Sequence, residues 1–584
     1  MSREQMPDVP QEGWGGSGEP APRPLVTPDS DDTPTRLLGS TFNNELTTAY
    51  GQGSSLPPIT TLPPTSQSAP GVGQPKRGLS RRALLIGAGA GAVGVGAIGA
   101  GAGFFLTKGN QRAGIPNVFA QDAGKIGHLL RRAGFGPSPS DIGTYLDAGV
   151  QGSIDLLLKP ASTQDDLDAR LKGLKLDYSK PEDLVRWYLL HMIYSKCPLQ
   201  EKMTLFWHGV LTSSFRDVGG KKNYALMVQQ NQTLREKGLG RFDDLIRAIS
   251  VDPAMLWYLD GRLSTGANPN ENYSRELMEL FTLGITDANG NPNYTQDDVH
   301  QGALALSGWT IAGGNGVFVK KRAYHGSVTY LGHTGNLGLD DVVKIVCAHP
   351  ATGRHIAWRM WSFFVYENPS DGDLRPLVDA YYKQDHSISA MVRAMLTSPA
   401  FFGEKAYRAR IKSPVELVVG VVRGLGLETD GTGLPALLQT MGQTPLDPPN
   451  VSGWDGDKVS AAWLSTQTWM ARVNFINLLL AAASGSAVRN GKSSGKATPD
   501  KSVIQQLITS RSIGSANALA DYVIAALLDN TLAADRRTVL RETLAQTAPD
   551  NGPAFTLAGG ARVPAAHVRD MLYLLMSMPE YQMN

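Results

Sequence analysis

The sequence predicts a mainly α-helical protein, in which a single large helical domain follows a disordered N-terminal arm and one membrane or signal segment. From about residue 121 onward, apolar residues recur at helical spacing, and Gly and Pro interrupt the pattern at intervals of roughly 12 to 25 residues. Long runs of alternating apolar and polar residues, which would indicate strands, are scarce. We therefore expect residues 121–584 to form one helical domain.

Residues 1–79 form the predicted arm. Pro, Ser, Thr, Gly and Gln dominate them, and their only aromatic residues are Trp14, Phe42 and Tyr50. Such a segment cannot bury enough apolar surface to offset the entropy lost on ordering. We expect it to be disordered.

The net charge and the cysteines exclude some classes of protein. A formal charge of +2, with Lys and Arg scattered among Asp and Glu, gives no basic stripe for nucleic acid. Nucleic acid is therefore not an expected partner. The two cysteines, Cys197 and Cys347, have no second cysteine nearby, which argues against a CxxC site. Their spacing leaves a disulfide between them open.

An export signal is predicted at residues 80–120. The pair Arg81 and Arg82 follows Lys76 and Arg77 and precedes 24 uncharged residues, 83–106. This layout resembles a twin-arginine signal, and it implies the twin-arginine translocase as a partner. The alternative is a retained membrane helix, since about 20 apolar residues cross a bilayer. Both interpretations put the N-terminus in the cytoplasm and the domain outside.

Cleavage of the signal is a separate question. Residues 118–120, Val-Phe-Ala, have the spacing that a signal peptidase prefers, although they lie well beyond the apolar run. A long arm in front of a discarded signal would serve no purpose, which favours a retained anchor.

Helix starts are marked by capping residues. Thr295 with Asp298 forms a capping-box pattern, and Pro414 opens an apolar run. Ser138, with Pro139 next and Asp141 three residues on, predicts another start. Residues 484–501, rich in Ser, Gly and Lys, are expected to form a loop.

Five segments of the predicted domain resemble the bacterial family of unknown function DUF1800. They are HLLRRAGFG (128–136), LFWH (205–208), ENYSRELMELFTLG (271–284), LSGWT (306–310) and PNVSGWDG (449–456). The resemblance covers about residues 122–584. It implies a large bacterial protein, often exported and often encoded beside another exported protein, with no assigned reaction. The chain departs from the family pattern at two places: Gly326 follows His325 where Asp is usual, and Gly209-Val210 replaces Asn-His.

The segment 271–284 is the most informative candidate. As a regular helix, it would place Glu276 and Glu279 one turn apart on the flank of its apolar face. Two such carboxylates could hold a metal or act as an acid and base pair. In the alternative, Arg275 or Arg359 neutralises them in a structural network.

Two histidines complete the candidate catalytic set of Glu276, Glu279, His208 and His325. His208 follows Phe206 and Trp207 on an apolar helix, where a lone histidine is commonly a hydrogen-bonded core residue. His325 lies in a Gly-rich stretch, and loops often carry function. These ligand types suit a divalent metal, but no spacing motif supports a metal site or identifies the metal.

Other residues are candidates for binding. Trp309 and Trp454 each follow Gly at a loop edge, where an exposed ring could stack on sugar and a buried ring could pin the loop. Asp455 belongs to the Pro- and Gly-rich segment 448–457, a candidate rim for a cleft. Residues 287–298 echo a calcium loop, although Pro292 stands where an EF-hand needs Gly.

Three hypotheses for function follow. The protein is an envelope enzyme acting on a polymer, a non-catalytic module that binds polysaccharide or protein, or an assembly factor for a co-encoded exported protein. Convergence of His208, Glu276, Glu279 and His325 in one pocket would favour the enzyme, and dispersal would favour binding or assembly.

Overall fold

The structure, a computed structural model, describes residues 118–139, 141–159, 165–483, 487–489, 492–494, 502–545 and 553–584. The predicted arm, Arg81, Arg82 and the apolar segment 83–106 lie outside these residues. Contacts along the chain divide it into two units, Met1–Pro75 and Lys76–Asn584, and all described residues belong to the second.

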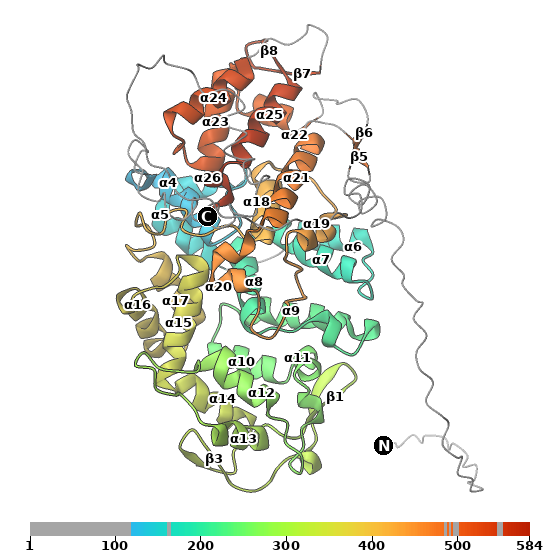
Figure 1. Cartoon of the computed structure of the whole chain (residues 1–584), viewed down its shortest axis with the longest axis vertical. Coiled ribbons are helices and arrows are strands. Elements are labelled where there is room, and N and C mark those ends of the chain that lie inside the picture. Colours follow the sequence, from blue (N-terminus) through green and yellow to red (C-terminus); the bar gives the residue numbers. More distant parts are fainter. Residues whose placement is uncertain are drawn as a thin grey trace, which may run out of the picture. The chain divides into compact units, whose positions relative to one another are not determined.

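Helices make up most of this unit, which confirms the predicted fold class (Figure 1). The first helices are α4 (Asp122–Arg132), α5 (Ile142–Leu158), α6 (Asp165–Leu174), α7 (Pro181–Tyr194), α8 (Pro198–Val210), α9 (Ala225–Lys237), α10 (Phe242–Ser250) and α11 (Pro253–Tyr258). The next are α12 (Glu271–Glu276), α13 (Gln296–Ala305), α14 (Leu339–Ala348), α15 (Pro350–Phe364), α16 (Asp371–Lys383) and α17 (Ile388–Leu396). The last are α18 (Pro414–Gly424), α19 (Leu434–Thr440), α20 (Asp455–Lys458), α21 (Thr466–Ala483), α22 (Val503–Ser510), α23 (Ala516–Leu528), α24 (Ala534–Ala545), α25 (Ala565–Met576) and α26 (Pro579–Gln582).

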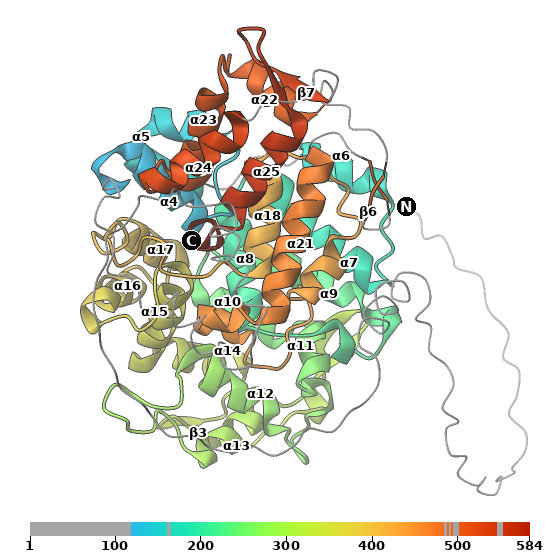
Figure 2. The ribbon, with the colours of Figure 1, turned by 45° about the horizontal axis from the view of Figure 1, so that its top comes forward.

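Shorter helical turns join these helices. The 3₁₀ turns are η1 (Val118–Ala120), η2 (Phe215–Asp217), η3 (Lys221–Asn223), η4 (Gly261–Leu263), η6 (Lys320–Arg322) and η7 (Ser460–Trp463). The element η5 (Leu277–Thr282) is a π-helix that continues α12. In Figure 2, α21 lies beside α18 and α25, and α21 contacts α25 directly.

Within the described residues, the strands form four separate antiparallel pairs. They are β1 (Trp309–Ala312) with β2 (Asn315–Phe318), β3 (Val328–Tyr330) with β4 (His333–Gly335), β5 (Ala487–Arg489) with β6 (Lys492–Ser494), and β7 (Ala554–Thr556) with β8 (Arg562–Pro564). The pair β5–β6 corrects the expectation of a plain loop at 484–501, because its described residues form a hairpin.

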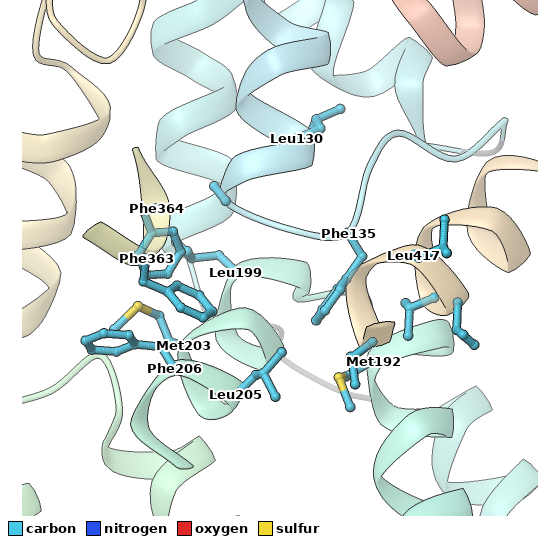
Figure 3. Packing of buried hydrophobic residues seen from close by; sticks show 14 of the residues in the cluster. Leu130, Phe135, Met192, Leu199, Met203, Leu205, Phe206, Phe363, Phe364 and Leu417 are labelled. Atoms are coloured by element: carbon cyan, nitrogen blue, oxygen red, sulfur yellow. The ribbon is translucent and has the colours of Figure 1, made fainter. Parts of the chain in front are cut away.

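One hydrophobic core connects the helices. Its buried residues run from Ile126 in α4 to Tyr581 in α26. Figure 3 shows part of it, where Phe206 of α8 lies beside Phe363 and Phe364 of α15. A core shared by the first and last helices supports the prediction of one domain.

Basic residues of the first helix tie it to distant segments. The buried Arg132 guanidinium donates to the carbonyl oxygens of Phe363, Phe364 and Val365 at the end of α15, at 3.3, 2.7 and 3.1 Å. It therefore satisfies carbonyl groups that a helix C-terminus leaves unpaired. The neighbouring Arg131 forms a buried ion pair with Asp529.

Two further ion pairs lie in the interior. Glu201 pairs with Arg235 at 2.8 Å, and Lys202 pairs with Glu416. Burial alone would raise the pKa of Glu201, but the charge and hydrogen bonds of Arg235 and His191 outweigh it and bring the value to about 2. Glu201 and Glu416 are thus buried carboxylates that each have a basic partner.

Two predicted helix starts are confirmed and one is wrong. Thr295 and Asp298 form a capping box, and Pro414 begins α18 after a Ser413 cap. By contrast, α5 begins at Ile142, three residues after Pro139, although the hydroxyl of Ser138 accepts the N–H of Asp141 at 3.2 Å as a capping residue would.

The turn η1 packs on the domain. The Phe119 ring makes edge contacts with the rings of His128, Phe402 and Tyr407, at centroid distances of 5.2, 5.9 and 5.7 Å. The proposed peptidase segment 118–120 is thus part of the packed structure.

Neither cysteine forms a disulfide, and both are buried, Cys197 at 5% and Cys347 at 0% exposed. Among the described residues, no helix has the length and apolar character needed to cross a bilayer.

Candidate functional site

The acidic segment predicted from the sequence changes its helical geometry halfway along. α12 is a regular helix with Asn270 as its cap, and it passes directly into the π-helix η5. π-helical turns are rare and occur frequently at functional sites. The Thr282 hydroxyl donates to the carbonyl oxygen of Leu277 at 2.5 Å, and Nε2 of His355 in α15 donates to that of Leu280 at 3.1 Å.

Glu276 is the last residue of α12, and Glu279 lies in η5. Both are partly buried, and among the described residues neither forms an ion pair. Arg275, the nearest candidate partner, pairs with Glu271 at 3.2 Å and also donates to Gln296 at 3.0 Å.

Arg359 does not neutralise these acids either. It donates to the carbonyl oxygen of Gly209 at 3.2 Å, and the negative charge that acts on it is that of Asp457. Neither arginine of the proposed network therefore forms an ion pair with the two glutamates, and only the charge of Arg275 acts on Glu276.

The two carboxylates have different surroundings. Burial raises the pKa of Glu276, the negative charge of Glu279 raises it further, and the Arg275 charge opposes the rise. Glu279 accepts a hydrogen bond of 2.8 Å from the Tyr294 hydroxyl. Glu276 is thus the carboxyl that gains from a proton or a cation, while Glu279 is held in place by the phenol.

Tyr258, at the end of α11, connects this pair with the segment after α19. Burial raises its pKa to about 12, and its hydrogen bond with Thr212 opposes the rise. The negative charges of three carboxylates raise the pKa of Tyr258 further, namely those of Asp217, Glu276 and Asp447. The phenol therefore lies among acids contributed by three different parts of the chain.

Asp447 belongs to the predicted loop region and is partly neutralised. Its Oδ1 accepts from the Ser214 hydroxyl at 2.7 Å, and its Oδ2 pairs with Arg216 at 2.8 Å. Burial nevertheless raises its pKa. Unlike Asp447, the partly buried Glu276 and Glu279 form no ion pair with any described residue.

His208 is a core residue. It is 1% exposed, its Nε2 accepts the N–H of Leu446 at 3.0 Å, and its ring meets that of Trp454 at a centroid distance of 5.4 Å. Burial lowers its pKa to about 4. This environment is the hydrogen-bonded core position named as the alternative to a catalytic role.

His325 lies on the exposed connection between η6 and β3. The described part of the chain contains no group of three or more His, Cys, Asp or Glu side chains placed to hold a metal ion. His208, His325 and the two glutamates are therefore not assembled into the divalent-metal site that their types allowed.

The candidate binding residues differ from one another. Trp454 is 3% exposed and packs with Ile411 and Trp463 in a small second hydrophobic cluster, so its ring pins the loop and is not free to stack on a sugar. Trp309 is half-buried in β1, against the exposed Phe318 at 5.4 Å. Asp455 is exposed at the start of α20.

The segment 287–298 is a self-contained turn. Asp287 accepts hydrogen bonds from the backbone of Asn289 and Asn291, at 2.8 and 2.9 Å. Asp298 is engaged by the cap at Thr295 and by the N–H of Leu331. Both carboxylates therefore accept hydrogen bonds that hold the turn and the helix start.

Sequence reasoning did not find Tyr258 and Tyr294. Tyr294 could have been found from the sequence, because it lies in the turn that returns the chain from η5 to α13. Tyr258 could not, because the acidic residues around it come from segments far apart in the sequence.

A family model described as a protein of unknown function (DUF1800) matches residues 128–583. The chain belongs to the DUF1800 family. No curated protein and no solved structure matches the chain. The DUF1800 match begins at His128 in α4 and reaches into the last residues of the chain, so it covers the core described above.

Proposed function

We propose that this protein is an exported cell-envelope module that binds a basic segment of another exported protein, with Glu276 and Glu279 as the binding carboxylates. The observation that carries the proposal is that this partly buried acid pair has no basic partner among the described residues. Partly buried charges without partners cost stability, and a ligand that supplies the missing cation recovers it.

A Lys or Arg side chain is the cation that fits this pair. An arginine guanidinium can bind one or two carboxylates with several donors, whereas a metal ion needs more ligands than the described residues assemble here. The dispersal of His208 and His325 also supports binding over a four-residue catalytic centre.

The export part of the proposal rests on the sequence. The paired arginines and the apolar run 83–106 support transport by the twin-arginine route. The packing of Phe119 supports retention of the anchor, because cleavage after Ala120 would remove that ring from its contacts with α4 and with residues 402–407.

Binding of a basic peptide tests the proposal. The full chain is titrated with a fluorescent arginine-rich peptide at low salt, and we expect the double change Glu276→Gln with Glu279→Gln to weaken binding at least about tenfold. The control, Glu182→Gln with Glu236→Gln, removes the same charge from exposed positions on α7 and α9. Equal loss in both double variants would reduce the effect to net charge and contradict the proposal.

An enzyme that acts on a polymer is the second candidate function. Its support is the raised pKa of Glu276 beside Glu279, since two carboxyls with different environments can serve as acid and base. Release of soluble fragments from purified cell-wall polymer by the wild type, and its loss in Glu276→Gln, would favour this candidate over binding alone.

A further inference from the structure

A small polar cavity lies between α8, α15 and α20, apart from the acidic pair. It has a volume of about 10 Å³, which is the space of one water molecule. Apolar walls come from Phe206, Val210, Trp358 and Phe363, and the polar lining consists of Gly209, Arg359, Ser362, Asp457 and Lys458.

Two polar atoms at this cavity are buried and unpaired. Ser362 is 2% exposed, and among the described residues its Oγ has no hydrogen-bond partner. Oδ2 of Asp457 is also buried, and no described residue forms a hydrogen bond with it. Such atoms are uncommon in folded proteins and indicate a bound water or ion.

Two cations line the cavity, and the charge of Asp457 acts on both of them, while that of Asp455 acts on Lys458 as well. Arg359 is 8% exposed, and its one hydrogen bond to a described residue goes to the Gly209 carbonyl. Lys458 is half-buried, and among the described residues neither cation has a carboxylate within ion-pair distance. Burial lowers the pKa of Arg359 to about 10 and also lowers that of Lys458.

The backbone at Gly209 lies close to the carboxyl group of Asp457. A Cβ on Gly209 would lie 2.7 Å from Oδ2 of Asp457. Any side chain at this position would therefore push against the carboxyl that borders the cavity.

We propose that this cavity binds a chloride ion, with Arg359, Lys458 and the Ser362 hydroxyl as donors and a protonated Asp457 as the fourth. Two cations against the one carboxyl of the lining favour an anion over a metal cation, since the Asp455 carboxylate is exposed and does not line the cavity. The volume admits a single-atom ion of roughly water size, whereas sulfate and phosphate are too large. A water molecule would satisfy Ser362 but would leave the positive charge uncompensated.

Chloride binding is coupled to a proton, because an ionised Asp457 would repel the anion and a protonated one donates to it. Burial raises the pKa of Asp457 to about 7. The charged groups around it are Arg359 on α15, Arg410 before α18, Glu416 on α18, Lys202 on α8 and Lys458 on its own helix. Lys202 pairs with Glu416 and Arg410 with Glu367, so Arg359 and Lys458 are the cations around Asp457 that form no ion pair with a described residue.

Thermal unfolding of the full chain tests the site. Sodium chloride is compared with sodium gluconate at constant ionic strength, and we expect chloride to raise Tm at pH 6 with an affinity about tenfold higher than at pH 8. Asp457→Asn should bind chloride with an affinity that does not change over this range. Equal Tm values in the two salts at both pH values, or an unchanged pH dependence in Asp457→Asn, would overturn the proposal.

Substitution of the proposed chloride donors provides a second test with a matched control. Lys458→Gln and Ser362→Ala should each weaken chloride binding at least about fivefold, whereas Lys405→Gln, an exposed lysine that lies over the Tyr366 ring, should not. Bromide soaked into wild-type crystals gives a direct test that does not depend on the folding of any variant. An anomalous peak between Arg359 and Ser362 is expected, and its absence at high bromide would assign the cavity to water.

Discussion

Nε2 of His355 donates a hydrogen bond to the carbonyl oxygen of Leu280, at 3.1 Å, and so connects α15 to the π-helix η5. A π-helical turn is less favourable than an α-helical one, so it needs support from outside the helix. Burial lowers the pKa of His355 to about 4, which keeps the ring neutral at physiological pH. The position of Glu279 therefore depends on a contact made by a different helix.

Replacement of His355 by Ala removes this donor. Because the Leu280 carbonyl then lacks its partner, we expect the free energy of unfolding in urea to fall by about 1 to 3 kcal/mol. His300→Ala is the control, because His300 is exposed and contacts Glu271 at the surface; its effect should stay within about 0.5 kcal/mol. Equal losses in the two variants would show that the contact does not support η5.

The two kinds of glutamate should respond differently to loss of charge. Glu276→Gln leaves no buried cation behind, so its unfolding free energy should change by less than about 0.5 kcal/mol. Glu201→Gln, the matched control, leaves Arg235 buried and uncompensated and should cost about 3 to 5 kcal/mol. Thermal and urea unfolding of both variants measure the contrast, and a large loss in Glu276→Gln would identify the acid pair as a structural element.

The burial of His208 predicts an acid-dependent loss of stability. Its pKa is about 4 in the folded state and about 6.5 in the unfolded chain, so the unfolded state binds more protons between these values. This stability is fully present above about pH 6.5 and is lost as the pH falls toward 4. His208→Gln keeps an acceptor for the Leu446 N–H but does not titrate.

The measurement is the difference in unfolding free energy between the wild type and His208→Gln. We expect this difference to move by about 2 kcal/mol in favour of the variant between pH 7 and pH 5. A constant difference over this range would mean that His208 is not desolvated in the folded protein.

The paired arginines predict the route of export. Changing Arg81 and Arg82 to Lys keeps the charge but removes the signal, so the protein should remain in the cytoplasm. Fractionation of cells that carry the double variant measures this outcome. Changing Lys76 and Arg77 in the same conservative way is the control, and unchanged export of the Arg81 and Arg82 variant would indicate a different pathway.

Local capping chemistry predicted part of the fold. Thr295 with Asp298 and Ser413 with Glu416 act within four residues, so the sequence is enough to specify both helix starts. At Ser138 the helix begins three residues later than the pattern predicts, and the Asp141 side chain pairs with Arg423, 282 residues away, at 3.1 Å. A competing long-range partner cannot be read from local spacing.

The candidate site was predicted less well than the fold. Glu276 and Glu279 were placed on a regular helix, whereas the second of them lies in a π-helix whose support comes from His355. Arg359 was assigned to the same acids but contacts Gly209 near Asp457, because α15 carries it to α8 and α20. These placements depend on tertiary packing that periodicity does not encode.

The two buried thiols can report local opening of the folded protein. Cys197 precedes α8 and Cys347 lies in α14, and both are shielded from solvent. Because burial raises the pKa of the Cys347 thiol, alkylation there must await a local opening that admits the reagent and solvates the sulfur. Mass spectrometry can measure the labelling rate of each cysteine separately. The two rates would therefore give the opening rates of two different parts of the domain without any engineered probe.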